Sequence, residues 1–159
     1  MNSPRKHSGK LEIFKLASTN PVILKPFNEP LLAGASGYQS FSSPAEDYPE
    51  MDLFSFLIKN SETTFPAKIE GDCLSEIGVF NNDWAIIEKG IAPKELDLVA
   101  VYIDDQPYIK RFNPKYDSNN RLKSLQFKTA NKNYADFDID ETTPFLLWGV
   151  IVGIVRKYR

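Results

Sequence analysis

From residue 61 onwards the chain is a succession of short runs rich in β-branched and aromatic residues, separated by Gly, Asn, Asp and Pro. The runs are TTFPAKIEG (63–71), DWAIIEKG (83–90), DLVAVYID (97–104), QPYIKRFN (106–113), RLKSLQFKTA (121–130) and PFLLWGVIVGIVRKYR (144–159). Such runs are typical of antiparallel strands joined by short turns. We expect Asp104 and Asp105 at a hairpin tip, and Gly149 and Gly153 at bulges or close contacts. The pattern predicts a mostly β domain, built as a small rolled antiparallel sheet or barrel.

The first part of the chain has a different composition. Residues 1–45 are rich in Pro, Ser, Asn and Gly, which predicts an extended N-terminal arm with one or two short strands at most. Residues 46–159 then form the domain. One short helix is predicted in EMDLFSFLIKN (50–60), with Asp52 near its start. Because the arm has no paired amphipathic helices, we expect no helix-turn-helix and no direct sequence-specific DNA binding.

Charge and composition exclude several kinds of protein. The chain carries 19 basic and 21 acidic side chains, a net charge of −2, which argues against non-specific nucleic-acid binding. With no apolar run of about 20 residues and a polar leader, we expect no membrane segment and a cytoplasmic protein. A single cysteine forms no intramolecular disulfide. The only histidine, His7, lies in the polar leader, so we expect no histidine-based catalytic or metal site and no cofactor.

The single cysteine, Cys73, lies in the turn-like stretch EGDCL (70–74) after a predicted strand. It is either a buried, inert thiol or a nucleophile whose turn supplies backbone N–H groups as an oxyanion hole. A nucleophile needs a base, and with histidine excluded Lys110 is the candidate. Lys110 shares a strand face with Tyr108 and Phe112. The strand pattern by itself favours a lysine whose ammonium reaches solvent over a buried lysine with a lowered pKa.

Several stretches, in the same order along the chain, resemble the LexA/UmuD family of self-cleaving peptidases with a serine-lysine dyad. They are FSSPAEDY (41–48), MDLFSFLIKNSETTFPAKIEGDCL (51–74), VFNNDWAIIEKG (79–90), DLVAVYIDDQPYIKRF (97–112), TANKNYADFDI (129–139) and WGVIVGIVRKYR (148–159). The likeness covers residues 41–159 well and 1–40 loosely. It places the family's serine on Cys73 and its catalytic lysine on Lys110. The missing DNA-binding domain points to the UmuD type rather than the LexA type.

The chain departs from the family at the nucleophile. A cysteine beside a lysine is expected to form a thiolate-ammonium pair, in which Lys110 donates a proton to the leaving amine. Cys73 is then a working nucleophile, a weakened one or an inactive substitute, and the sequence leaves these three open.

The second departure is the cleavage site. The family cuts between a small residue and glycine, and Ala33-Gly34 has that chemistry. Spacing from FSSPAEDY points instead to Gln39-Ser40, whose first side chain is large for such a pocket. We favour Ala33-Gly34, because glycine allows a nucleophile to approach the backbone closely.

The resemblance also implies partners. A RecA filament on single-stranded DNA promotes self-cleavage of the arm, and the shortened protein is an accessory subunit of an error-prone UmuC-type translesion polymerase. A homodimer is expected, with the apolar last strand as its contact. The rival hypothesis is a dimeric binding module with a dead or weakened Cys73 site, which acts only as a polymerase or repressor partner. A signal-peptidase relative with the same dyad would need a membrane anchor.

Overall fold

The structure is a computed structural model that describes residues 9–15, 23–24 and 51–159. The chain divides into two compact units, one formed by residues 1–17 and 60–159 and the other by residues 18–59. The predicted boundary between arm and domain, at residues 45 and 46, lies outside the described residues.

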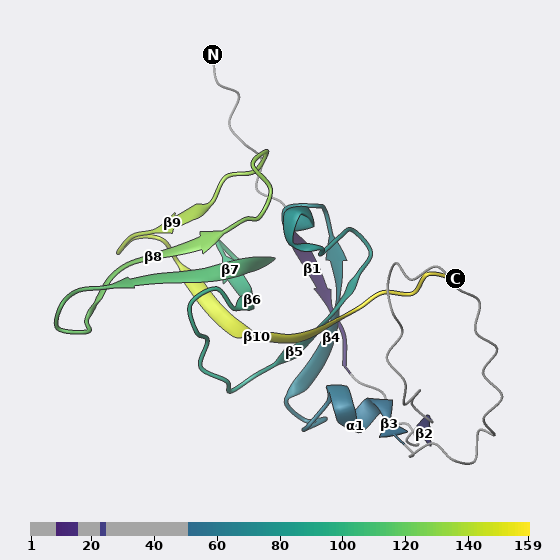
Figure 1. The fold of residues 1–159 in the computed structure, drawn as a ribbon. Helices are drawn as coiled ribbons and strands as arrows, with labels where there is room; N and C mark the ends of the chain where they lie inside the picture. Colours follow the sequence, from purple (N-terminus) through teal and green to yellow (C-terminus); the bar gives the residue numbers. More distant parts are fainter. Residues whose placement is uncertain (1–8, 16–22, 25–50) are drawn as a thin grey trace, which may run out of the picture. The chain divides into compact units, whose positions relative to one another are not determined.

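The larger unit contains one antiparallel sheet of eight strands (Figure 1). Its strands are β1 (Lys10–Ile13), β4 (Thr64–Glu70), β5 (Trp84–Glu88), β6 (Leu98–Ile103), β7 (Gln106–Tyr116), β8 (Leu122–Lys128), β9 (Phe137–Ile139) and β10 (Phe145–Val155). They are ordered β1-β4-β5-β10-β6-β7-β8-β9 across the sheet. The prediction of a mostly β, antiparallel fold is therefore confirmed.

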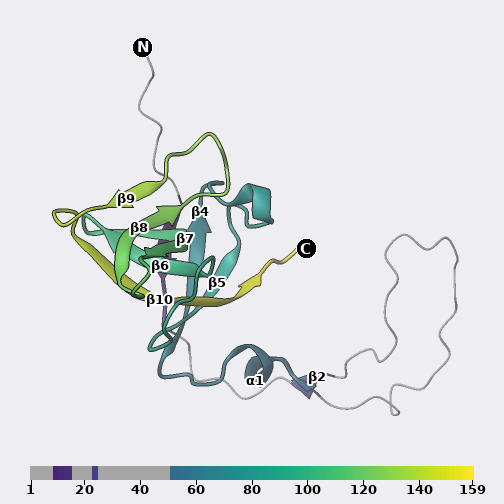
Figure 2. The same ribbon diagram turned by 60° about the vertical axis from the view of Figure 1, so that its left-hand side comes forward.

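The sheet closes on itself through its first strand. β1 pairs with β4 along its whole length and also with β7, where Lys10 lies opposite Tyr108. Six strands, β1, β4, β5, β10, β6 and β7, thus form a closed ring, and β8 and β9 extend it (Figure 2). The barrel-like roll that the strand pattern predicts is completed by residues from the expected arm.

Two predicted details are confirmed. Asp104 and Asp105 form the β6–β7 turn, both with positive φ angles, 50° and 59°. The register of β10 shifts between Leu147 and Gly149 against β6, and between Ile151 and Gly153 against β5. A Cβ on Gly149 would lie only 2.8 Å from the carbonyl oxygen of Glu88, so the close contact requires glycine.

Two clusters of apolar side chains form the core. The first consists of Leu11, Ala67, Ile69, Cys73, Leu74, Val79, Ala85, Ile87, Ala100 and Ile109. The second consists of Val99, Val101, Ile103, Leu125, Phe127 and Val150. Successive side chains of a strand point to opposite faces, so β7 contributes Ile109 to the first cluster, while Tyr108 and Phe112 pack against the second. Lys110 therefore lies between two aromatic neighbours on its strand, as the alternation predicts.

The described residues of the smaller unit form two short strands and a helix. β2 (Ile23–Leu24) pairs with β3 (Met51–Asp52), and α1 (Leu53–Leu57) follows directly. The side chain of Asp52 caps α1 by accepting a hydrogen bond from the backbone N–H of Phe54, at 3.0 Å. The predicted helix exists but is only five residues long, because Ile58 is already extended.

Candidate functional site

Cys73 lies in the core on the turn that follows β4. Its side chain is 2% exposed, and the next residue, Leu74, is equally buried. The turn leads directly into a short 3-10 helix, η2 (Ser75–Ile77). The backbone N–H of Ala130 donates to the Cys73 carbonyl at 2.8 Å, and Ala130 in turn accepts from Glu76 N–H at 3.0 Å. The loop after β8 therefore fixes the backbone of the cysteine turn.

The same loop holds the residue before the cysteine. The amide of Asn131 donates to the backbone carbonyl of Asp72 at 3.0 Å and to Ser75 Oγ at 3.2 Å. The hydroxyl of Tyr134 donates a hydrogen bond to the Asp72 carboxylate. The carboxylate of Asp72 thus joins the turn to a loop about 60 residues away along the chain.

Lys110 is completely buried. Its exposed fraction is 0%, and its Nζ lies 5.7 Å from the ring centre of Tyr108 and 5.6 Å from that of Phe137. The preference of the strand pattern for a solvent-reaching ammonium is wrong. That pattern considers β7 alone, whereas Phe137 comes from β9, the strand beyond β8 at the edge of the sheet. Aromatic rings from two strands thus enclose an amine that water would otherwise solvate.

The structure brings the side chains of Cys73 and Lys110 together in a hydrogen bond. Burial lowers the pKa of Lys110 and raises the pKa of the Cys73 thiol, and their mutual attraction opposes both shifts without reversing either. Both directions favour the uncharged pair, a thiol beside a neutral amine. These directions run against the expected thiolate-ammonium pair, because burial outweighs the cation's effect on the pKa of the thiol.

A neutral amine beside a thiol is suited to one kind of chemistry. Lys110 can accept the thiol proton as the sulfur forms a bond, which is general-base catalysis. The backbone N–H of Cys73 also lowers the pKa of the thiol, against the larger effect of burial.

Gly9, the residue before β1, lies against this pair. A Cβ on Gly9 would lie 2.4 Å from Cys73 Sγ and 3.2 Å from the carbonyl oxygen of Ile109. The carbonyl oxygen of Gly9 accepts a hydrogen bond from Ile109 N–H at 2.7 Å, and Cys73 Sγ lies 3.9 Å from the Ile109 carbonyl oxygen. The backbone of residue 9 therefore fills the space beside the sulfur.

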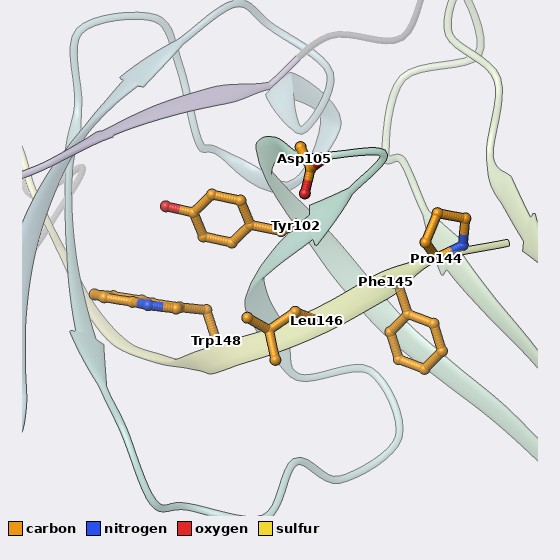
Figure 3. Close-up of a pocket in the computed structure, with 6 residues that line it drawn as sticks. All are labelled: Tyr102, Asp105, Pro144, Phe145, Leu146 and Trp148. Atoms are coloured by element: carbon orange, nitrogen blue, oxygen red, sulfur yellow. The ribbon is translucent and has the colours of Figure 1, made fainter.

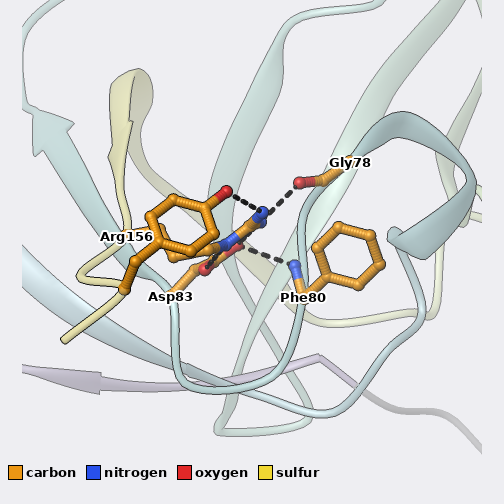
Figure 4. A network of polar contacts seen from close by, with 5 residues as sticks. Gly78, Phe80, Asp83 and Arg156 are labelled. Atoms are coloured by element: carbon orange, nitrogen blue, oxygen red, sulfur yellow. Dashed lines mark hydrogen bonds and ion pairs between the residues drawn. The ribbon is translucent and has the colours of Figure 1, made fainter.

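A partly buried ion pair fixes the segment that directly follows η2 (Figure 4). Arg156 donates to both carboxylate oxygens of Asp83, at 2.6 and 2.5 Å, and to the carbonyl of Gly78 at 2.7 Å. Its guanidinium also lies 4.6 Å from the ring centre of Phe80. Hydrogen bonding to Arg156 lowers the pKa of Asp83, which is 1% exposed. The segment after β10 thus holds the turn that leads out of the cysteine region.

A separate hollow of about 300 Å³ lies along β6 and β10 (Figure 3). It is lined by Tyr102, Asp105, Pro144, Phe145, Leu146 and Trp148. Neither Cys73 nor Lys110 contributes to it, so it is distinct from the cysteine-lysine site.

The candidate scissile bonds, Ala33-Gly34 and Gln39-Ser40, lie outside the described residues, as does His7. Within residues 9–15, 23–24 and 51–159, no three His, Cys, Asp or Glu side chains gather closely enough to hold a metal ion. In the same part of the chain, no helix combines the length and apolar character needed to cross a membrane.

Sequence reasoning did not identify three residues near the pair: Gly9, Asn131 and Tyr134. A signal for Gly9 was present, because a glycine directly precedes a run in which Leu11 and Ile13 alternate with polar residues. Asn131 and Tyr134 fall in a stretch quoted only for its family likeness. Their role depends on a loop that folds onto a distant turn, which local patterns do not reveal.

Comparison with known proteins places these features in a family. Residues 30–152 match the family described as Peptidase S24-like. A LexA repressor from Clostridium botulinum (strain Hall) is 34% identical over 101 residues, which cover 64% of this chain and 46% of the repressor. A LexA repressor from Sorangium cellulosum is 27% identical over 103 residues, which cover 64% of this chain and 42% of the repressor. Protein SamA from Salmonella typhimurium is 29% identical over 145 residues, which cover 87% of this chain and 96% of SamA. The chain thus spans about half the length of these LexA repressors and nearly all of SamA.

Proposed function

Because this chain belongs to the Peptidase S24-like family, in its LexA/UmuD group, we propose that it is a self-cleaving peptidase with Cys73 as nucleophile and Lys110 as general base. The observation that carries the proposal is the hydrogen bond between these two buried side chains, whose burial favours thiol and neutral amine. The proposed substrate is the chain's own arm, cut between Ala33 and Gly34, with Gln39-Ser40 as the alternative bond.

The first half of the reaction forms a thioester. Cys73 Sγ attacks the carbonyl carbon of Ala33 while Lys110 Nζ takes the thiol proton. The backbone N–H of Cys73 stabilises the oxyanion that develops on the Ala33 carbonyl. The C–N bond to Gly34 then breaks, and the Gly34 nitrogen leaves as an amine that takes the proton back from Lys110.

The second half restores the enzyme. Lys110, neutral again, accepts a proton from a water molecule that attacks the thioester carbonyl. The C–S bond breaks, Cys73 recovers its proton from Lys110, and residues 1–33 are released with a free carboxylate at Ala33. The products are residues 1–33 and residues 34–159.

We also propose the context in which the cut occurs. The resemblance to the UmuD type supports promotion by a RecA filament on single-stranded DNA and a later role with a UmuC-type translesion polymerase. Such a filament would stabilise a conformer in which the scissile bond lies beside Cys73, which is a shift of population rather than a new catalyst.

A homodimer belongs to the same proposal. Several side chains of β10 are both apolar and exposed, namely Phe145, Leu146, Val152 and Val155. An exposed apolar strand of this kind is typical of a surface that another molecule covers. A second copy of the chain, packed against these exposed side chains of β10, is the partner that the family resemblance favours.

The test is the intact mass of the protein after incubation at pH 7 to 10, and separately with RecA, an ATP analogue and single-stranded DNA. We expect loss of residues 1–33, or of 1–39 for the alternative bond. Cys73→Ala and Lys110→Met should abolish the cut. Lys115→Met, a change of an exposed lysine on the same strand, should leave it intact.

The variant Cys73→Ser separates the remaining hypotheses. If only the serine form is cut, Cys73 is an inactive substitute in a site that still works. If no form is cut under any condition, the peptidase proposal fails and the dimeric binding module takes its place.

A further inference from the structure

Strand β1 occupies a slot between β4 and β7 that opens onto the cysteine-lysine pair. β1 pairs with β4 from Lys10 to Ile13, and Gly9 and Lys10 reach β7 at Ile109 and Tyr108. We infer that this slot is a peptide-binding site, that residues 9–13 are its resident ligand, and that the ligand closes Cys73 against any other peptide. The inference rests on the geometry of β1 and does not require Cys73 to cut a bond.

The closure follows from the space around the sulfur. A carbonyl carbon under attack must come within about 3 to 3.5 Å of the nucleophile. A single Cβ added to Gly9 would already lie 2.4 Å from Cys73 Sγ, so residue 9 occupies that space. The hydrogen bond from Ile109 N–H holds the Gly9 carbonyl in place at 2.7 Å. A scissile peptide can therefore reach the sulfur only after the start of β1 has moved away.

The slot also specifies the chemistry of its ligand. The position facing the sulfur accepts only glycine, because no room exists for a side chain and because Gly9 has a φ of +95°. Two residues later Leu11 is buried against the first core cluster, and Ile13 packs against it from a half-buried position. Lys10 and Glu12 are exposed. The ligand is thus an extended peptide that begins with glycine and has apolar residues two and four positions later.

The first experiment measures the rate at which a maleimide labels Cys73 in the full chain at pH 7. Because the chain has one cysteine, the intact mass reports this site alone and separates labelled full-length chains from any shortened ones. Labelling requires β1 to leave the slot. Leu11→Ala should therefore accelerate labelling about 30-fold or more. Truncating a buried leucine shifts an equilibrium by at least about this factor, and here the equilibrium is that between β1 in the slot and β1 out of it.

Two variants serve as controls. Leu125→Ala truncates a leucine of the same exposure, 6%, in the second core cluster, away from the slot. It should lower global stability without accelerating labelling. Glu12→Ala changes an exposed side chain of β1 and should label like the parent chain. Equal acceleration by Leu11→Ala and Leu125→Ala would mean that the sulfur is reached by global unfolding, and the inference would be wrong.

The second experiment adds the ligand in trans. A synthetic peptide GKLEIFK, the sequence of residues 9–15 with blocked ends, should bind the opened slot of the Leu11→Ala chain and slow its labelling. The peptide AKLEIFK, with alanine opposite the sulfur, should not. Failure of GKLEIFK to protect, or equal protection by both peptides, would refute the peptide site. These readouts stand whether or not the chain cleaves itself, so the two proposals fail separately.

Discussion

The opposite shifts of Lys110 and Cys73 should make the free energy of unfolding depend on pH in two opposite ways. Burial lowers the pKa of Lys110 in the folded state, while in the unfolded chain it returns to about 10.4. Between these two values the unfolded state binds one proton more than the folded state. Stability due to Lys110 therefore rises with pH throughout that window and is constant above about pH 10.4.

The cysteine acts in the other direction. Burial raises the pKa of Cys73 above the unfolded value of about 8.5, so above that pH the folded state holds a proton that the unfolded state has lost. Stability due to Cys73 consequently falls as pH rises from about 8.5 towards its folded pKa. Each effect has a limiting slope of about 1.4 kcal/mol per pH unit, the value for one proton. In the native pair the two slopes cancel in part, which hides both.

Four chains separate the two effects: the native chain, Cys73→Ala, Lys110→Met and the double variant. The difference in unfolding free energy between Cys73→Ala and the double variant isolates Lys110 and should rise with pH. The difference between Lys110→Met and the double variant isolates Cys73 and should fall above about pH 8.5. These three variants lack at least one member of the pair, so self-cleavage should not disturb the comparison.

The assay is urea unfolding from pH 6 to 10.5, followed by the fluorescence of Trp84 and Trp148, which lie on β5 and β10. Methionine at position 110 keeps the volume of lysine without its amine, so the double variant should also be more stable than Cys73→Ala near neutral pH, by about 1 to 4 kcal/mol. A Lys110 difference that stays flat over the whole range would show that the amine titrates as in water. The neutral-pair mechanism would then be wrong.

Three further predictions concern the supports of the site and the hairpin tip. Asp83→Asn should lower the stability by about 2 kcal/mol at pH 7, because it weakens the charged hydrogen bonds that the partly exposed Arg156 donates to Asp83. Because the pKa of Asp83 is lowered, the difference in unfolding free energy between the native chain and Asp83→Asn should shrink only as the pH falls below about 4, which urea unfolding can measure. Tyr134→Phe should lower the stability by about 1 kcal/mol and slow self-cleavage, because Asp72 loses a hydrogen bond. An unchanged half-time of cleavage would show that the cysteine turn does not need this hydrogen bond. Asp105→Gly should stabilise the protein by about 1 kcal/mol by relieving a φ of +59°, whereas Asp105→Ala should give no gain in melting temperature.

Local patterns predicted the elements of the fold well, because strand alternation and turn residues are local properties. The runs around residues 64–70 and 106–116 formed strands where β-branched and aromatic residues alternate with polar ones. The two acidic residues 104 and 105 formed the hairpin tip, since Asp tolerates the positive φ angles of such turns better than most residues.

The environment of the site was less predictable, because it depends on contacts between distant segments. The burial of Lys110 needs Phe137 from β9, and the closed state of Cys73 needs Gly9 from the other end of the chain. The directions of the pKa shifts of the pair then follow from that burial. A pattern read along β7 alone contains none of these contacts, which is why it favoured an exposed ammonium.

The place of β1 in the ring also bears on what the proposed cut would leave behind. β1 precedes Ala33, so cleavage there separates a barrel strand from the rest of the domain as part of a 33-residue peptide. If that peptide departs, β4 becomes an edge strand, and the first part of β7, around Tyr108 and Ile109, loses its partner on one side. The backbone N–H and C=O groups left unpaired there readily accept a strand from another chain. The shortened protein would then be a receptor for β-strand addition, while the uncut chain supplies that strand itself.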